Sequence, residues 1–326
     1  MILPRPKLGT LQLDHPFLLA PMAGIGDPPY RRLCRRGGAA MVCAEMVSAN
    51  ALHYNDTRSQ AMLKTWPDEH PISLQFFGND PDRLALGARL AEANGADVVD
   101  LNAGCPVPKI TKSGGGLSLM KDEALFFRCL SAMVKAVRVP VTVKIRLGFR
   151  RGENLALTFA RLAEDAGASA LVVHARAQED RHSGPPDLDA LAAVVQTVKI
   201  PVFGNGGVAT ATDALTMMNH TGVVGVLIGQ AAVGNPFLFW EILQTITHPD
   251  APPTLSLPQR FDLLKEHAQM MVDYYGETPG LRRLRKHIPA YVRGLPHSAP
   301  FRFQANRLDR LPDFMKLLSE FESSQC

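Results

Sequence analysis

Cys105 is the residue of this 326-residue chain whose type and setting are best suited to chemistry. It lies in Asn-Ala-Gly-Cys-Pro at 102–106, in a loop expected to follow a strand, whereas Cys34, Cys43 and Cys129 lie in or beside apolar segments and are expected to be packing residues. A free thiol has a pKa of about 8.5 and is mostly protonated at neutral pH. It can therefore act as a general acid as well as a nucleophile. The sequence shows no clear Cys–His pairing that would favour the nucleophile.

Polar residues also recur at the expected ends of the other strands. A single buried lysine or histidine is usually a core residue with a hydrogen-bond partner. Polar residues at every strand end instead indicate a polar ligand that lies across the side where the strands end. The residues that define this pattern are Glu45, Gln75, Asp100, Asn102, Lys144, Arg146, His174, Arg176, Asn205 and Gln230.

Two glycine-rich segments, Gly204–Ala209 and Gly229–Pro236, follow the last two expected strands. The first matches the dinucleotide pattern G-x-G-x-x-A, but no acidic residue follows about twenty positions later. We therefore interpret these segments as a phosphate site of a barrel, made by backbone N–H groups. Flavin mononucleotide (FMN) has the corresponding shape, with Gln75, Lys144 and His174 at its ring. A lysine at the pyrimidine edge would stabilise the reduced ring.

The elements that must position these residues alternate between short apolar runs and helical patterns. The runs are continuously apolar, as in parallel strands buried on both faces, and their count predicts a (β/α)8 TIM barrel, with a doubly wound open sheet as the alternative. Lys7–Asp14 is expected to form a hairpin that plugs the bottom of the barrel. The expected strands are Phe17–Pro21, Ala40–Glu45, Ile72–Phe76, Asp97–Asn102, Val141–Arg146, Ala170–His174, Pro201–Gly204 and Val223–Gly229.

The chain changes character after Thr247. Residues 1–247 are predicted to form the barrel, 248–257 a proline-rich linker, and 258–326 a small helical domain. From Leu281 to Arg310 eight basic residues face one acid, Asp309, in a chain of net charge +4. This stretch fits either a polyanion-binding patch or a solvated helical face. The same two interpretations apply to Arg31, Arg32, Arg35 and Arg36.

Composition excludes several protein classes. Hydrophobic residues make up 46% and charged residues 20%, which is typical of a globular chain and not of a disordered one. No apolar run is long enough for a transmembrane helix, and the N-terminus lacks a signal peptide. The five cysteines are odd in number and lack a Cys-x-x-Cys pair, which argues against a disulfide scaffold or a zinc site. We expect a cytoplasmic protein without a metal or membrane partner, and a monomer.

Taken together, the motifs resemble those of the tRNA-dihydrouridine synthases of the bacterial type, which are flavoenzymes that reduce uridine in tRNA. The most specific match is Asp-Leu-Asn-Ala-Gly-Cys-Pro-Val-Pro-Lys at 100–109, followed by Ser-Gly-Gly-Gly at 113–116. The Pro21–Gly24, Gln75, Lys144–Arg146, His174–Arg176, Asn205–Gly206 and Ile228–Gly229 elements come in the family's order, and Arg285–His287 resembles its helical domain.

This resemblance implies roles for individual residues. Cys105 would be the proton donor, and NADPH would reduce the FMN and leave before the RNA reacts. The expected FMN-binding residues are Pro21, Met22, Ala23, Gln75, Lys144, His174, Asn205, Gly206, Gly207, Gly229 and Gln230. The expected substrate contacts are Asn102, Lys109 and Arg176 for the base, and Arg282, Arg283, Arg285 and Lys286 for the tRNA backbone.

The implied reaction is reduction of the C5–C6 double bond of specific uridines in tRNA to 5,6-dihydrouridine. Hydride from FMN would add at C6 and Cys105 would protonate C5, with the base unstacked into the barrel mouth. Two departures bear on the phosphate site: the family usually has arginine at the position of Gln230 and commonly an acidic residue at Gly207. The alternatives are an FMN-barrel oxidoreductase acting on a small pyrimidine or an enone, and a non-catalytic tRNA-binding chaperone.

Overall fold

A closed barrel of parallel strands forms the body of the molecule. The structure is a computed structural model that describes residues 3–181, 183–251 and 253–325. The barrel strands are β3 (Phe17–Leu19), β4 (Val42–Cys43), β5 (Val47–Ser48), β6 (Ile72–Phe77), β7 (Val98–Ala103), β8 (Val141–Arg146), β9 (Ala170–His174), β10 (Val202–Asn205) and β11 (Gly225–Ile228). Neighbouring strands pair in parallel in the order β3-β11-β10-β9-β8-β7-β6-β4.

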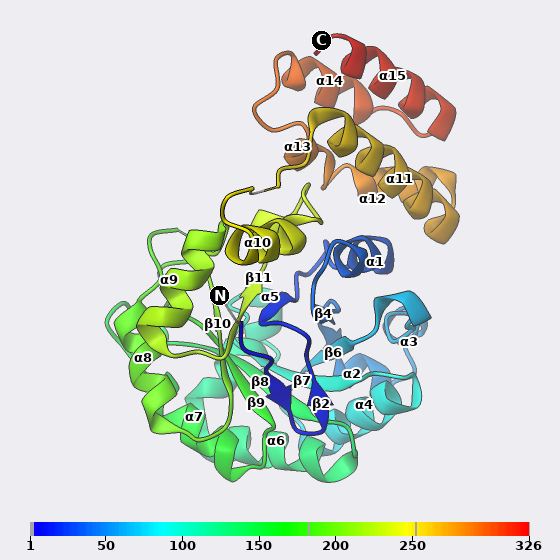
Figure 1. The fold of residues 1–326 in the computed structure, drawn as a ribbon. Helices are drawn as coiled ribbons and strands as arrows, with labels where there is room; N and C mark the ends of the chain where they lie inside the picture. The colour runs from blue at the N-terminus through cyan, green and yellow to red at the C-terminus, as the bar shows by residue number, and fades with distance from the viewer. Residues whose placement is uncertain (1–2, 182, 252, 326) are drawn as a thin grey trace.

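Two backbone hydrogen bonds close this sheet on itself. Leu19 N–H donates to the Met41 carbonyl and Ala40 N–H to the Phe17 carbonyl, each over 2.9 Å. The chain between each pair of strands crosses the outside of the barrel, mostly as helix (Figure 1). The predicted (β/α)8 barrel is confirmed, and the open-sheet alternative is wrong because both ends of the sheet are joined.

The second barrel strand is shorter and more broken than the predicted Ala40–Glu45. β4 and β5 both pair with β6, with Val42 opposite Ile72 and Val47 opposite Phe76. The chain from Val42 to Val47 therefore contains one residue more than the facing stretch of β6. Such a bulge bends the strand and re-aims a side chain, and here it contains Glu45.

The barrel helices begin at defined caps. The side chains of Asp80, Asp122, Asp187 and Thr210 each accept a backbone N–H at a helix start, which satisfies donors that the helix leaves open. The helices are α1 (Pro28–Arg36), α2 (Ala49–His53), α3 (Thr57–Ala61), α4 (Pro81–Ala93), α5 (Pro108–Thr111), α6 (Glu123–Ala136), α7 (Ala156–Asp165), α8 (Leu188–Thr197), α9 (Ala211–Thr221) and α10 (Leu238–Thr247), with 3-10 turns at Pro67–Glu69, Gly116–Lys121 and Gln230–Ala232.

A hairpin closes the N-terminal end of the barrel, as predicted. β1 (Lys7–Leu8) pairs antiparallel with β2 (Leu11–Gln12). Leu8 and Leu13 are buried in one apolar cluster with Val98 and Ala170, the first residues of β7 and β9. This plug leaves the opposite end of the barrel, where the strands finish, for polar side chains.

The C-terminal helices pack around an apolar cluster of their own. They are α11 (Leu257–Tyr275), α12 (Glu277–Leu284), α13 (Ile288–Tyr291), α14 (Ser298–Ala305) and α15 (Leu311–Ser323). The cluster includes Leu264, Met271 and Phe314, together with Leu33 of α1, so the helices are docked on the barrel beside α1 and α10 (Figure 1). None of the described helices is long and apolar enough to cross a membrane.

Each of the four arginines of α1 has a partner within the protein. Arg31 is buried, and its guanidinium pairs with the Glu69 carboxylate over 2.8 Å. Arg36 pairs with Glu266 of α11. The remaining partners are Asp68 for Arg32 and the His70 and Ala39 carbonyls for Arg35. These arginines fasten α1 to its neighbours, including the helical domain.

Candidate active site

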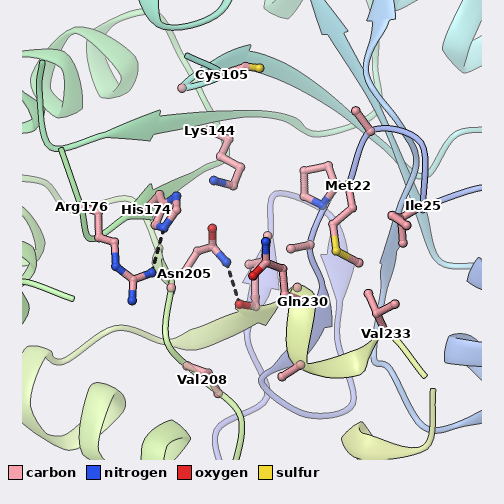
Figure 2. Close-up of a pocket in the computed structure, with 18 of the residues that line it drawn as sticks. Met22, Ile25, Cys105, Lys144, His174, Arg176, Asn205, Val208, Gln230 and Val233 are labelled. Carbon is pink, nitrogen blue, oxygen red and sulfur yellow. Dashed lines mark hydrogen bonds between the residues drawn. The ribbon is translucent and has the colours of Figure 1, made fainter. Parts of the chain in front are cut away.

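A cavity of about 730 Å³ lies at the C-terminal ends of the barrel strands. Every strand position of the barrel contributes to its lining, because the ends of parallel strands all face the same side. Figure 2 shows Lys144, His174 and Asn205 pointing into its middle. The predicted site residues that line it are Pro21, Met22, Ala23, Gln75, Asn102, Cys105, Lys144, His174, Arg176, Asn205, Gly206, Gly207, Gly229, Gln230 and Lys286.

A buried hydrogen-bond network fixes the polar floor of this cavity. The Gln75 amide donates to the Asp100 carboxylate over 2.6 Å and accepts from the Asn102 amide over 2.8 Å. The Thr142 hydroxyl donates to the other Asp100 oxygen over 2.5 Å. Burial raises the pKa of Asp100 to about 6, and the bonds from Gln75 and Thr142 work against that rise. The Gln75 amide is thus held in one orientation.

The same network reaches the loop that contains Cys105. The Asn102 side-chain oxygen accepts the backbone N–H of Cys105 over 3.0 Å and that of Gly104 over 3.3 Å. Cys105 is half-buried, whereas the other three cysteines that the structure describes are fully buried. Burial raises the pKa of the Cys105 thiol, so the thiol keeps its proton at neutral pH.

Gly116 explains part of the glycine run that follows this loop. Its φ is +58°, and a Cβ atom there would lie 2.6 Å from the Cys105 carbonyl oxygen. The Cys105 carbonyl in turn accepts the backbone N–H of Leu117 over 3.0 Å. Only glycine allows the chain to pass this close to the loop of Cys105.

Lys144 presents an unpaired amine to the cavity (Figure 2). Among the residues that the structure describes, no hydrogen bond or ion pair satisfies this amine. Burial, together with the nearby Arg146 guanidinium, lowers the pKa of Lys144 to about 8. An unpartnered cation in a cavity is costly unless a ligand accepts from it, so the Lys144 amine is a candidate donor to a bound ligand.

His174 and Arg176 lie side by side on the wall of the cavity. A guanidinium nitrogen of Arg176 is 3.4 Å from His174 Nε2, and another donates to the Gly184 carbonyl over 2.6 Å. Gly206 has a φ of +113°, and a Cβ atom there would lie 2.8 Å from the His174 ring. The glycine therefore makes room for the imidazole.

The glycine segments after β10 and β11 line the cavity near Asn205. The Asn205 amide donates to the Leu227 carbonyl over 2.9 Å and so ties β10 to β11. Gly207 has a φ of +76°, a conformation in which any other residue is strained. Gln230 is exposed and follows Gly229 at the rim. The positive φ at position 207 therefore explains why this chain has glycine there. At position 230, which is exposed, a larger side chain would have space.

The helical domain closes one side of the site. Lys286 Nζ donates to the Gly24 carbonyl over 3.2 Å, and the Gly24 N–H donates to the Glu45 carboxylate. The loop that begins at Pro21 is therefore held between the bulge of the second strand and the helical domain. Arg293 also lines the cavity from this side.

The other predicted substrate contacts lie away from the cavity lining. Lys109 is exposed on α5. Arg282 and Arg285 pair with Asp309 over 3.3 and 2.9 Å, and the Arg283 guanidinium lies over the Tyr275 ring at 4.2 Å from its centroid. For the three arginines, a ligand would have to compete with a partner inside the protein.

Glu45, Asp100 and Arg146 belong to the polar strand ends that the sequence indicates, but their individual roles do not follow from it. Arg293 was not predicted as a site residue. Arg146, the last residue of β8, donates to the carbonyls of Gly104, Ala177 and Arg181, each over 3.1 Å, and so joins the loops that follow β7 and β9. Nothing in the sequence separates Arg293 from the other basic residues of its stretch.

The donor set of the cavity fits the FMN that the sequence analysis predicts. A flavin ring has polar edges that accept hydrogen bonds, and Lys144 and Gln75 offer donors there. Gly206 and Gly207 offer backbone N–H groups, uncovered by side chains, for the phosphate of FMN. The strongest evidence for a ligand acceptor at this position is that the Lys144 amine has no partner among the described residues.

Comparison with known proteins places this site in context. The family model described as dihydrouridine synthase (Dus) matches residues 18–324. The chain is 41% identical over 302 residues to tRNA-dihydrouridine synthase B of Pseudomonas aeruginosa, covering 93% of this chain and 91% of that protein. It is 39% identical over 311 residues to a probable tRNA-dihydrouridine synthase of Mycobacterium tuberculosis, covering 92% and 80% respectively.

Solved structures share the fold at low identity. Histamine dehydrogenase from Rhizobium sp. 4-9 superposes with a TM-score of 0.58 at 12% identity, covering 82% of this chain and 50% of that one, so this chain spans half the length of that protein. TcOYE with pHBA superposes with a TM-score of 0.56 at 12% identity, covering 78% and 95%. At this identity the likeness shows a shared fold alone.

Proposed function

Because the chain belongs to the dihydrouridine synthase family of enzymes, we propose that it reduces the C5–C6 double bond of specific uridines in tRNA to 5,6-dihydrouridine. The observation that carries this proposal is the cavity in which Cys105 and Lys144 both lie. It combines a protonated thiol with an unpaired amine at the mouth of a barrel. The relatives' names supply the tRNA substrate.

FMN is the cofactor that we assign to this cavity. Gln75, Lys144 and His174 would hold its ring, Pro21, Met22 and Ala23 would pack against it, and Asn205, Gly206, Gly207, Gly229 and Gln230 would hold its phosphate. When bound, FMN supplies the hydride that adds at C6 of uracil, and NADPH is the reductant that we propose for it. Lys144 favours negative charge at the ring edge that it faces.

Cys105 is the residue that completes the reduction. Uracil C5 needs a proton once C6 has taken the hydride, and a neutral thiol can supply it. Burial raises the pKa of this thiol, so the proton is present at neutral pH. The Asn102 side chain holds the backbone of Cys105 and Gly104, which keeps the thiol at one position of the wall.

The tRNA must present an unstacked uridine to this cavity. We propose Asn102, Lys109 and Arg176 as contacts to the substrate. Lys286, with Arg293, stands where the helical domain meets the cavity, and Arg282, Arg283 and Arg285 belong to the same basic stretch. These cations would contact phosphates, which fixes the register of the RNA without reading its sequence. A cytoplasmic location and a monomeric state remain predictions.

The test is mass spectrometry of nucleosides from unmodified tRNA incubated with the purified protein, FMN and NADPH. A gain of two hydrogens on uridine, mapped to a defined position, is the expected result. Flavin-loaded protein that leaves tRNA unchanged but reduces a free pyrimidine or an enone would overturn the proposal in favour of a small-molecule reductase. Protein that binds tRNA but neither flavin nor NADPH would instead indicate a chaperone.

A further inference from the structure

Three buried side chains of ligand type converge at the joint between barrel and helical domain. Asp27 precedes α1 and is 5% exposed, while His267 of α11 and His287 before α13 are both 0% exposed. One carboxylate oxygen and one nitrogen of each imidazole lie within 4.8 Å of one another. None of the three belongs to the lining of the FMN cavity.

Three of the four imidazole nitrogens of this cluster lack a hydrogen-bond partner among the residues that the structure describes. His267 Nδ1 lies 3.2 Å from the Tyr291 hydroxyl, but His267 Nε2 and both nitrogens of His287 are buried without a hydrogen bond to any described residue. The two rings are packed with their centroids 4.6 Å apart, at an interplanar angle of 70°. Buried polar atoms are nearly always paired, and leaving one unpaired destabilises the folded protein. A neutral imidazole has one nitrogen with a lone pair and one N–H, so the cluster calls for a further group that accepts one lone pair from each ring.

A divalent transition-metal ion has the chemistry to do so. Neutral imidazole nitrogens and a carboxylate oxygen form a ligand set that zinc takes in proteins. A metal-bound histidine typically donates its other N–H to a neighbouring acceptor, which orients the ring. The Tyr291 hydroxyl is such an acceptor for His267, and the Tyr30 backbone N–H holds the Asp27 carboxylate over 3.2 Å.

We propose that Asp27, His267 and His287 together bind one Zn²⁺ ion that fastens the helical domain to the barrel. A water would take the fourth position of the usual tetrahedral arrangement. The three ligands come from segments separated by up to 260 residues, so the ion cross-links α1 to α11 and to the turn before α13. It would thereby hold Lys286 and its neighbours in place beside the cavity. The cysteine spacing argued against a zinc site, and this ligand set contains no cysteine.

The test measures metal content and its effect on stability, and it does not depend on tRNA reduction. The full chain, without a polyhistidine tag, is dialysed against metal-free buffer and its zinc is counted by mass spectrometry. We expect about one equivalent per chain. A strong chelator should remove the ion and lower the melting temperature by several degrees, and added Zn²⁺ should restore it.

Variants assign the ion to these residues. His287→Gln should retain less than a tenth of an equivalent and show no response of the melting temperature to Zn²⁺. The matched control is His53→Gln, since His53 is exposed at the end of α2 and should leave both readouts unchanged. Zinc retained in full by His287→Gln would overturn the assignment.

A second measurement covers the case in which His287→Gln fails to fold. The wild-type protein, depleted of zinc and flavin, is titrated with Co²⁺, and its visible spectrum is compared with that of the Zn²⁺ form. Tetrahedral Co²⁺ bands that saturate at one equivalent support the site. Protein that contains less than a tenth of an equivalent of any transition metal and shows neither bands nor a thermal shift overturns the proposal.

Discussion

The side-chain oxygen of Asn102 accepts the backbone N–H of Cys105 over 3.0 Å. The same amide donates to Gln75, which itself donates to Asp100. One asparagine thus links the thiol loop to the residue that we assign to the flavin ring. Asn102 was predicted as a substrate contact, and in this structure it also acts through Cys105, as a positioning residue.

Asn102→Ala should therefore loosen the loop of Cys105. We expect tRNA reduction to fall by roughly 10–100-fold, because the substitution removes the hydrogen bonds of Asn102 to Cys105, Gly104 and Gln75 and with them the orientation of the thiol loop. The alkylation rate of Cys105 should also change, with Cys105→Ala as the background control for the other thiols. A variant that loses activity while its thiol reacts at the wild-type rate would limit Asn102 to contact with the substrate.

Cys105→Ala should keep the flavin but lose turnover. Removing a general acid costs about 10²–10⁴-fold in rate, and the alanine leaves the backbone bond to Asn102 in place. Single-turnover reduction of tRNA by the prereduced enzyme, compared with the flavin absorbance of the same sample, separates the two effects. Full activity would remove Cys105 from the mechanism.

The affinity for FMN should depend on pH through Lys144. Its pKa is lowered to about 8 in the free protein, so the amine is charged below that pH. An electron-rich ring edge favours the charged amine and raises its pKa in the complex. Binding then takes up a proton above pH 8, and affinity falls by up to about tenfold per pH unit from there.

Fluorescence titrations of FMN at pH 7 and pH 9 measure this dependence. The Lys144→Met variant is the control: it should bind FMN more weakly at pH 7 and lose the difference between the two pH values. An equal pH dependence in both proteins would assign the proton to another group.

Gln230→Arg should tighten FMN binding. Gln230 is exposed at the rim of the cavity, so the longer side chain has space, and a charge-assisted bond to phosphate is worth about 1.5–3 kcal/mol. We expect a dissociation constant lower by about tenfold or more. Riboflavin, which lacks the phosphate, should gain nothing, and an equal gain for riboflavin would place Gln230 away from the phosphate.

Arg293 and Arg282 should differ in their effect on tRNA binding. Arg282 pairs with Asp309, whereas Arg293 lines the cavity and has no ion pair among the described residues. Arg293→Gln should weaken tRNA binding and reduce the slope of affinity against salt by about one, while Arg282→Gln should do less. Filter binding of tRNA at several salt concentrations measures both, and a larger loss for Arg282→Gln would reverse this order.

The sequence by itself determined the barrel and the loop that contains Cys105. Continuous apolar strands and the residues at their ends are local patterns, because each strand carries its own signal for burial on both faces. The parallel arrangement then brings those ends to one side. The family resemblance rests on the same local motifs, since a motif such as residues 100–109 is contiguous in the chain.

Only the tertiary structure decided which charges are free and which groups meet. Arg31 and Arg36 form ion pairs with Glu69 and Glu266, and no pattern within α1 predicts those partners. Lys286 reaches Gly24 across 262 positions of the chain, and Asp27 meets His267 in the same way. The physical reason is that a charge or a ligand atom is defined by its neighbours in space, and folding selects those neighbours from segments far apart in the sequence.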